Sequence, residues 1–412
     1  MFKTEKFNLK NGLKICIIPN KSVDSVTFHL KGLAGSNFEK SNQVGSAHLI
    51  QHLNSTQGNK NKILSKGGKI IGVTSRDDVL YMVKVLKEDI IDSLEFLSNV
   101  FNKQEFPNSE FEKQKEVAIQ EITRMKNVPE KLIGRISHKL MFPNDRLAKF
   151  NTGDEIDIRR LKINDVEDFK SEYYYPNNFV LVISGAVSTK NVLPYVQKYF
   201  GDFTKGKSAE YITHKLYSGF SSQNYLLQNS RQTHVKIDFD AYRTSEDKKY
   251  AALILSYLID SYLKNLVKET IGLVYKISCS SISTGSYGTF SIYFASDDKN
   301  VEKILSEIKR CLSNIENLVT VRNIEQVKTK ILANLTFGFE KTSIRAEYYS
   351  DLLLHGREEQ DHTYEMKTIK MLAVPKVKGL AKELLSQQPK ITIISSGKNQ
   401  IDAEKLWKAQ EG

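Results

Sequence analysis

The chain has 412 residues, of which 40% are hydrophobic and 26% charged, as in globular proteins and unlike disordered or collagen-like ones. Lys and Arg outnumber Asp and Glu by 60 to 48, but this excess is spread along the chain without a basic run, so we expect no nucleic-acid partner. No apolar run reaches the roughly 18 residues that a membrane span needs. The length favours two domains.

The first half is predicted to contain, in chain order, strands at 13–18 and 26–33, a helix at 46–53, strands at 69–74 and 79–86, helices between 90 and 125, and a strand at 179–184. The residues before the first of these strands alternate around Asn11-Gly12, which predicts a hairpin and not a targeting peptide. The helix after Ser109 is the best defined, because Ser109 can cap it and Phe111, Ile119 and Ile122 recur at helical spacing.

A polar stretch at 204–222 lacks periodicity and marks a linker. The second half repeats the plan, with a strand at 234–239, a helix at 248–267, strands at 275–282 and 289–294, a helix at 301–318 and a last strand at 390–395. This repetition predicts an internal duplication. The expected fold class is α+β, with two homologous sheet-and-helix domains at 1–204 and 223–412 joined by a linker at 205–222.

Three cysteines, Cys16, Cys279 and Cys311, lie far apart in the sequence, which predicts free thiols in a reducing compartment. We therefore expect a cytoplasmic protein, or one of an organelle matrix if a presequence has been removed. The run Tyr173 to Tyr175 before Pro176 is expected to pack at the seam between the domains.

His48 and His52 lie four residues apart on one face of a predicted helix, with Gln51 on the same side. Two neutral imidazoles at this spacing can bind one zinc ion, although such a pair also arises by chance on a packed or solvated face. The sequence His-x-x-Gln-His differs by one side-chain atom type from the inverted zinc motif His-x-x-Glu-His.

With this motif in place, the chain resembles the pitrilysin/insulinase family of zinc peptidases, and most closely its short two-domain subunits, such as mitochondrial processing peptidase and its bacterial relatives. The resemblance covers nearly the whole chain, including Asn11-Gly12-Leu13, Gly67-Gly68, Tyr175-Pro176-Asn177-Asn178 and Gly272-Leu273-Val274-Tyr275. It implies one half of a peptidase clamshell. It also implies a homo- or heterodimer with another family subunit, enclosing a chamber for unfolded peptide or presequence.

The resemblance implies a third metal ligand at Glu121, in the segment Val117-Ala118-Ile119-Gln120-Glu121-Ile122. One zinc ion would then be held by His48, His52 and Glu121, with a fourth position left for water. A second family glutamate, seven residues before the ligand, supports such a site, and Gln114 stands there in this chain.

Further site positions follow from the same resemblance. Lys268 stands where active members have an arginine, and Tyr275 matches the tyrosine that they place seven residues later. Ile71 and Gly72 replace the Asn-Ala pair that binds substrate backbone at a strand edge.

Four departures from the family pattern, Gln51, Gln114, Ile71 and Lys268, favour natural loss of activity over one engineered substitution. Gln51 takes the place of the general base, and an amide cannot accept a proton from water. The expected function is therefore a catalytically impaired, peptide-binding partner of an active peptidase. Two alternatives remain open, namely an active zinc endopeptidase whose glutamate has been replaced by Gln51, and a metal-free scaffold subunit.

Overall fold

The computed structural model describes residues 3–102, 105–397 and 401–408. They form two compact units, and each unit draws on three segments of the chain. Unit 1 is built from residues within 1–122, 150–212 and 335–364. Unit 2 is built from residues within 123–149, 213–334 and 365–412. The α+β fold class expected from the sequence is confirmed.

Unit 1 contains a six-stranded mixed sheet with the order β1-β2-β6-β3-β5-β4. Its strands are β1 Glu5–Asn8, β2 Lys14–Pro19, β3 Ser25–Gly32, β4 Lys69–Thr74, β5 Val79–Leu86 and β6 Phe179–Gly185. The pair β2 and β6 is parallel and the other pairs are antiparallel. The predicted N-terminal hairpin is confirmed, since Gly12 adopts a φ of 90° between β1 and β2, a conformation that glycine adopts readily.

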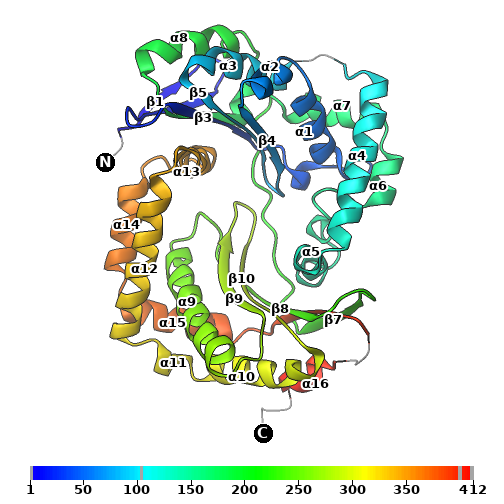
Figure 1. Ribbon diagram of the computed structural model, residues 1–412, viewed down its shortest axis with the longest axis vertical. Coiled ribbons are helices and arrows are strands. Elements are labelled where there is room, and N and C mark those ends of the chain that lie inside the picture. Colours follow the sequence, from blue (N-terminus) through cyan, green and yellow to red (C-terminus); the bar gives the residue numbers. More distant parts are fainter. Residues whose placement is uncertain (1–2, 103–104, 398–400, 409–412) are drawn as a thin grey trace. The chain divides into compact units, whose positions relative to one another are not determined.

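Both faces of this sheet are covered by helices. The helices that lie wholly or mostly in unit 1 are α1 Ser46–Thr56, α2 Lys60–Ser65, α3 Ile90–Ser98, α4 Asn108–Lys126, α6 Glu155–Arg160, α7 Ile163–Tyr173, α8 Thr189–Phe200 and α13 Thr342–Leu354. Figure 1 shows α3 and α8 on one face of the sheet and α13 on the other. All seven residues of β6 are buried as a result, as expected for a strand covered on both sides.

The main core of unit 1 lies under α1, α3 and α8 and contains Phe28, Leu53 and Phe179. Tyr174 belongs to this core and packs against Phe179 with ring centroids 5.4 Å apart, whereas the sequence predicts a seam position for it. The reason is that the chain turns at Pro176, directly after α7, and enters the central strand β6.

Unit 2 contains a five-stranded sheet with the order β7-β11-β8-β10-β9. Its strands are β7 Ser221–Leu226, β8 Thr233–Asp240, β9 Lys276–Ser283, β10 Gly288–Ser296 and β11 Lys390–Ser395. Helices that lie wholly or mostly in this unit are α5 Pro129–Met141, α9 Lys248–Leu263, α10 Val301–Ser313, α11 Ile315–Leu318, α12 Val321–Phe339, α14 His362–Met371, α15 Val374–Leu385 and α16 Ala403–Lys408. Strand β7 overlaps the end of the predicted linker. It was not predicted as a strand, because its six residues are polar or exposed and give no strand pattern.

The two sheets share one plan. Strands β2, β6, β3, β5 and β4 of unit 1 correspond in order and direction to β7, β11, β8, β10 and β9 of unit 2. Corresponding pairs of neighbouring strands run in the same relative direction in both sheets. In each half the parallel pair is formed by a strand from the start and a strand from the end of that half. This correspondence supports the internal duplication predicted from the sequence.

Each unit also includes a helix from the opposite half of the sequence. Helix α13 packs on β3 and β6 of unit 1, and α5 packs on β8 and β11 of unit 2. The chain passes between the units at 212–213, inside the predicted linker, and also at four other positions. The division at 205–222 remains a prediction about the duplicated halves, because the compact units are assembled from exchanged segments.

Candidate metal centre

Helix α1 carries the histidine pair, and its start is fixed by two residues outside it. Gly45 precedes the helix with a φ of 96°, and a β-carbon there would lie 2.4 Å from Ile158 Cδ1. The buried carboxylate of Glu39 accepts hydrogen bonds from the backbone N–H groups of Gly45 and Ala47, at 3.0 and 2.9 Å. A carboxylate at this end also interacts favourably with the helix dipole. The orientation of α1 is therefore firmly set.

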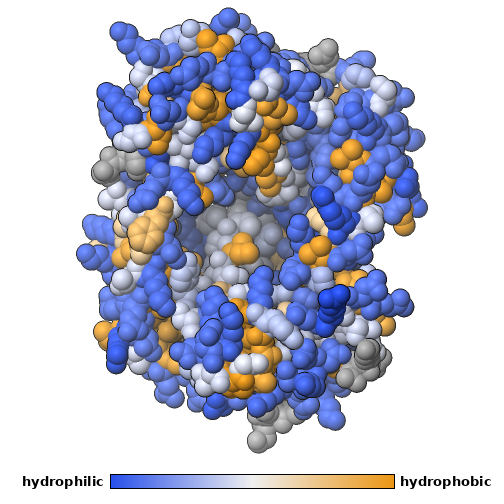
Figure 2. All heavy atoms as spheres, viewed as in Figure 1, coloured by the Kyte–Doolittle hydropathy of each residue, from blue (hydrophilic) through white to orange (hydrophobic). Residues whose placement is uncertain are grey.

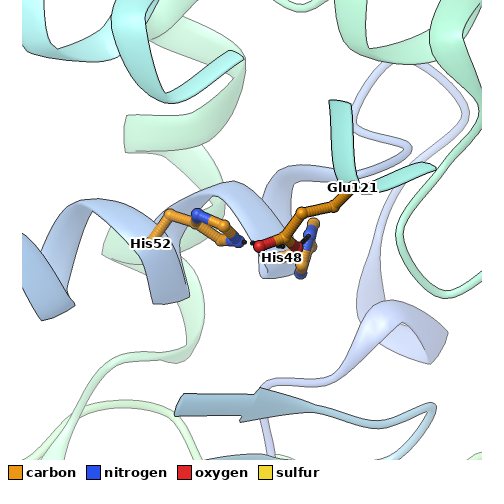
Figure 3. A group of neighbouring side chains, drawn as sticks. All are labelled: His48, His52 and Glu121. Atoms are coloured by element: carbon orange, nitrogen blue, oxygen red, sulfur yellow. Dashed lines mark ion pairs between the residues drawn. The ribbon is translucent and has the colours of Figure 1, made fainter. Parts of the chain in front are cut away.

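His48 and His52 project from the same side of α1, with ring centroids 4.5 Å apart and ring planes at 76°. Glu121, from α4, meets them, and its Oε2 lies 3.6 Å from His48 Nε2 and 3.5 Å from His52 Nε2. Figure 3 shows the three side chains pointing toward one another. One ligand atom from each residue lies within 4.8 Å of the others, although Glu121 comes 69 positions after His52 in the sequence.

The charge state of this group suits a divalent cation. Hydrogen bonds from His48 and then His52 hold the pKa of the Glu121 carboxyl well below its usual range, against the opposing effect of partial burial. The carboxylate is therefore ionised at neutral pH. Two imidazoles and a carboxylate form a donor set that is typical of zinc, and the three residues present fit such an ion.

Gln114 lies about two helical turns before Glu121 on α4 and is buried. Its Oε1 lies 3.3 Å from His52 Nδ1, and its Nε2 donates to Glu110 Oε1 at 2.7 Å. Because an amide oxygen can only accept, His52 Nδ1 donates the hydrogen bond in this contact, and Nε2 is the ring nitrogen that faces Glu121. Glu110 thus fixes the amide of Gln114, which in turn orients His52.

Gln51 is buried on α1 but is held by contacts of its own. Its Nε2 donates to Ser55 Oγ at 3.0 Å, and that hydroxyl donates to the main-chain carbonyl of Gln51 at 2.7 Å. The side chain also lies against β4, because a β-carbon placed on Gly72 would be 1.8 Å from Gln51 Nε2 and 2.4 Å from its Cδ. Gly72 therefore provides the space in which the Gln51 amide lies.

Strand β4 is the last strand of its sheet and pairs only with β5 among the described residues. Ile71 and Val73 are exposed by 46% and 45%, and Figure 2 shows a strip of apolar side chains over this strand. An exposed strand edge of this kind can accept another extended segment through main-chain hydrogen bonds.

The sequence matches the models of one protein family in both halves. A family described as "Insulinase (Peptidase family M16)" matches residues 14–153, and one described as "Peptidase M16 inactive domain" matches residues 160–331. This chain belongs to the M16 peptidase family. The resemblance predicted from the sequence is thereby confirmed.

Individual M16 relatives are distant in sequence but similar over their length. An uncharacterized zinc protease of Rickettsia bellii is 24% identical over 359 residues, which are 83% of this chain and 86% of that protein. The mitochondrial-processing peptidase subunit beta of Saccharomyces cerevisiae is 24% identical, over 84% of this chain and 80% of its own. The crystal structure of a protease from Helicobacter pylori superposes with a TM-score of 0.86 at 19% identity, covering 96% of this chain and all of that one.

The remaining site positions carried over from the M16 family lie in unit 2. Lys268 belongs to a π-helix, Lys264–Thr270, that continues α9, and its side chain is half exposed beside Glu269. Tyr275, 60% exposed, lies directly before β9 and donates a hydrogen bond to Asp297 Oδ1 at 3.3 Å. Their proposed role toward a substrate stays a prediction.

Three residues at the site were not predicted from the sequence. Glu39 and Glu110 act from a loop and from the start of α4, where no motif marks them. Ser55, four residues after Gln51, does have a signal, because residues four apart on a helix are neighbours. Within the described residues no helix is long and apolar enough to cross a membrane.

Proposed function

We propose that this M16 chain is a zinc-binding, hydrolysis-impaired subunit that holds extended peptide and pairs with another subunit of its family. The observation that carries the proposal is the combination of a preserved His48, His52 and Glu121 group with Gln51 at the position of the general base. Metal binding and proton transfer depend on different residues, so one can persist when the other is lost.

His48, His52 and Glu121 are the residues that would hold the zinc ion. When bound, zinc would supply a Lewis acid with an open position for water or a peptide carbonyl. The chain's own contribution is orientation, since Gln114 Oε1 accepts a hydrogen bond from His52 Nδ1, and Nε2 is the nitrogen that would bind the ion.

Gln51 is the residue that limits hydrolysis in this proposal. Its amide has no basic oxygen at neutral pH, and loss of a general acid or base typically lowers the rate by about 10²- to 10⁴-fold. Its Nε2 is also engaged by Ser55 and lies against Gly72. The side chain is therefore held in place by partners other than a water molecule.

Peptide binding is assigned to the edge of β4, with Ile71 and Gly72 on that strand. The main-chain groups of an extended segment would pair with the strand edge, and such pairing does not require the Asn-Ala sequence of active members. An unfolded peptide or presequence is the expected ligand class. Lys268 and Tyr275 are assigned to a peptide-binding role in unit 2.

Zinc content measured by elemental analysis tests the metal part of the proposal. We expect close to one zinc ion per chain in the purified protein and almost none in the His48→Ala, His52→Ala double variant. The matched control is His138→Ala, at a helical histidine that does not belong to the group. Zinc retained in the double variant would refute the site, and absence of zinc from the wild type would favour the metal-free scaffold.

Hydrolysis of an unstructured peptide tests the impaired activity. We expect the wild type with full zinc to cleave at least about 10²-fold more slowly than an active M16 peptidase. The alternative, an active endopeptidase whose glutamate has been replaced, is favoured by the otherwise intact metal group. It predicts chelator-sensitive cleavage by Gln51→Glu at the rate of active relatives.

Association with another subunit is proposed because the relatives include a protein named as a subunit, the yeast mitochondrial-processing peptidase subunit beta. Both homo- and heterodimers satisfy this proposal. Co-purification from the source organism with size measurement by light scattering tests it, and a strictly monomeric protein would contradict it. We place the protein in the cytoplasm or an organelle matrix, in keeping with three buried free cysteines.

A further inference from the structure

A cavity of about 430 Å³ lies beside α7 in unit 1, apart from the metal group. Its apolar wall is made of aromatic rings from Phe101, Tyr174, Tyr175 and Phe203. Two of the three tyrosines before Pro176 therefore line a cavity, a role that the metal site does not explain. The volume lies in the range of small-molecule binding sites.

Lys170 of α7 also lines this cavity and is only 8% exposed. Its Nζ donates one hydrogen bond, to Asn54 Oδ1 at 3.3 Å, and lies 4.5 Å from the centroid of the Phe106 ring. No carboxylate of the described part of the chain forms an ion pair with it. Burial lowers the pKa of Lys170 to about 8, so the amine still carries a proton at neutral pH.

An ammonium group has three donors, and a buried charge is costly unless these are paired. Lys115 of α4 shows how this chain normally satisfies a buried lysine. It is 9% exposed and lies over the Phe111 ring, but its Nζ donates to the carbonyls of Arg159 and Leu161 and to Glu112. Lys170 has a similar setting but only one oxygen partner within hydrogen-bond distance, and its side chain lines the cavity together with Glu167, whose charge partly offsets the effect of burial.

The rest of the polar lining has the opposite charge. Glu105, Glu167 and Asp202 line the same cavity, and Glu105 and Asp202 are exposed. These carboxylates would repel a phosphate or a simple fatty acid. A ligand that carries both a carboxylate and an ammonium group, joined by apolar parts, complements the whole lining.

We propose that this cavity binds a free dipeptide with apolar side chains. Its carboxylate pairs with Lys170, its side chains pack on the rings of Phe101, Tyr174 and Phe203, and its ammonium group faces Glu167 and Asp202. The occupant is a zwitterion held away from the metal centre, so the cavity is a separate binding site of this chain.

Isothermal titration calorimetry with leucyl-phenylalanine tests the proposal. We expect saturable binding of one dipeptide per chain, weakened about tenfold or more when the ligand is N-acetylated or C-amidated, because each cap removes one charged hydrogen-bonding group. Decanoate, which has the carboxylate but no ammonium group, should bind more weakly than the dipeptide. Equal binding of the capped forms or of decanoate would overturn the assignment, as would no saturable binding at millimolar dipeptide.

Four variants locate the binding. Lys170→Gln should weaken dipeptide binding at least about tenfold, whereas Lys115→Gln, the matched buried lysine, should not change it. Ser171→Trp places a large ring at the exposed edge of the lining and should block binding without altering the core. The His48→Ala, His52→Ala double variant should bind as the wild type does. Binding that survives both Lys170→Gln and Ser171→Trp, or that is lost in the metal-site variant, would contradict the proposal.

Discussion

The side chain of Gln51 occupies the space that a β-carbon would fill at position 72. Among the family departures, Gln51 and Gly72 are thus linked by direct contact, because the amide could not lie as it does against an alanine. Ser55 completes the arrangement, because its Oγ accepts a hydrogen bond from Gln51 Nε2. A substitution at any of these three positions should therefore change the packing or hydrogen bonding at the other two.

We predict that Gly72→Ala destabilises the wild type by about 1 to 3 kcal/mol, because the added methyl group displaces a buried side chain. The same substitution should cost less in a Gln51→Ala background, with a coupling of about 0.5 kcal/mol or more. Urea unfolding of the four proteins measures this. Gly134→Ala, where a β-carbon would meet no atom within 4 Å, is the control, and additive free energies at positions 51 and 72 would contradict the prediction.

Gln114 permits a second prediction, which rests on the proposed zinc site. Gln114→Ala removes the acceptor of the His52 Nδ1 proton, and such a loss typically weakens metal binding about 10- to 100-fold. Competition with a zinc chelator measures the affinity. Gln120→Ala, an exposed glutamine on the same helix, should leave the affinity unchanged, and equal affinities for both variants would show that Gln114 does not orient His52.

The residue pattern and the family resemblance together predicted the group His48, His52 and Glu121, and the structure brings these three residues together. Helical spacing accounts for the histidines, while Glu121 depended on the family resemblance, because no local pattern relates α4 to α1. The contact of Gln51 with Gly72 was not predictable. It depends on how closely α1 approaches β4, a distance that side-chain packing sets and sequence spacing does not.

At the scale of elements, the contact between β3 and α13 differs from the apolar core on the other face of the sheet. Thr27 shares a hydrogen bond with Thr342 at 2.9 Å, and Lys31 pairs with Asp351 and, at 3.5 Å, with Asp78. His29 lies between Thr27 and Lys31 on the same side of β3. It is 2% exposed, and neither ring nitrogen has a hydrogen-bond partner in the described part of the chain.

Burial lowers the pKa of His29 to about 4, with Lys31 adding to this effect and Asp351 opposing it. The unfolded chain, with an ordinary histidine pKa near 6.5, therefore binds more protons than the folded one between these values. Stability is fully present above about pH 6.5 and is lost as the pH falls toward about 4. From pH 7.5 to pH 5 we expect His29 to account for a loss of about 2 kcal/mol.

Denaturant unfolding at pH 7.5 and pH 5 measures this effect by comparing the wild type with His29→Leu. The variant should lose less stability over this interval than the wild type does. Thr27→Val, on the same face and without a titratable group, should keep the wild-type dependence. An unchanged pH dependence in His29→Leu would mean that this histidine is accessible to protons in the folded protein.

Strong periodicity made the strands and the major helices predictable, and weak periodicity explains what was missed. Strand β7 is polar and mostly exposed, so its pairing with β11 shows only in the structure. The predicted helix at 248–267 continues as a π-helix from Lys264, a change of hydrogen bonding that leaves little trace in composition.

At the scale of the whole molecule, the duplicated halves are not self-contained. Apolar residues of α13 and the end of α12, including Ala346, Tyr349 and Leu352, cover Cys16, Ile18, Val180 and Val182 on the face of the unit 1 sheet opposite its main core. In unit 2, residues of α5 such as Leu132 and Ile136 cover Ile394 of β11. Each half of the sequence therefore supplies a helix that the sheet of the other half needs. A linear pattern could not reveal this, because both helices have ordinary amphipathic sequences.

Separate production of residues 1–212 and 213–412 tests this dependence. Alone, the first fragment leaves the face around Val180 and Val182 exposed, so we expect dye binding typical of exposed apolar surface and no cooperative unfolding. Produced together, the two fragments should form a soluble complex that unfolds cooperatively. Leu352→Asp on the second fragment should prevent complementation, because it places a charge in the buried contact, whereas Ile344→Asp, at an exposed position of the same helix, should permit it. Cooperative unfolding of the isolated first fragment would show that the half completes its core without α13.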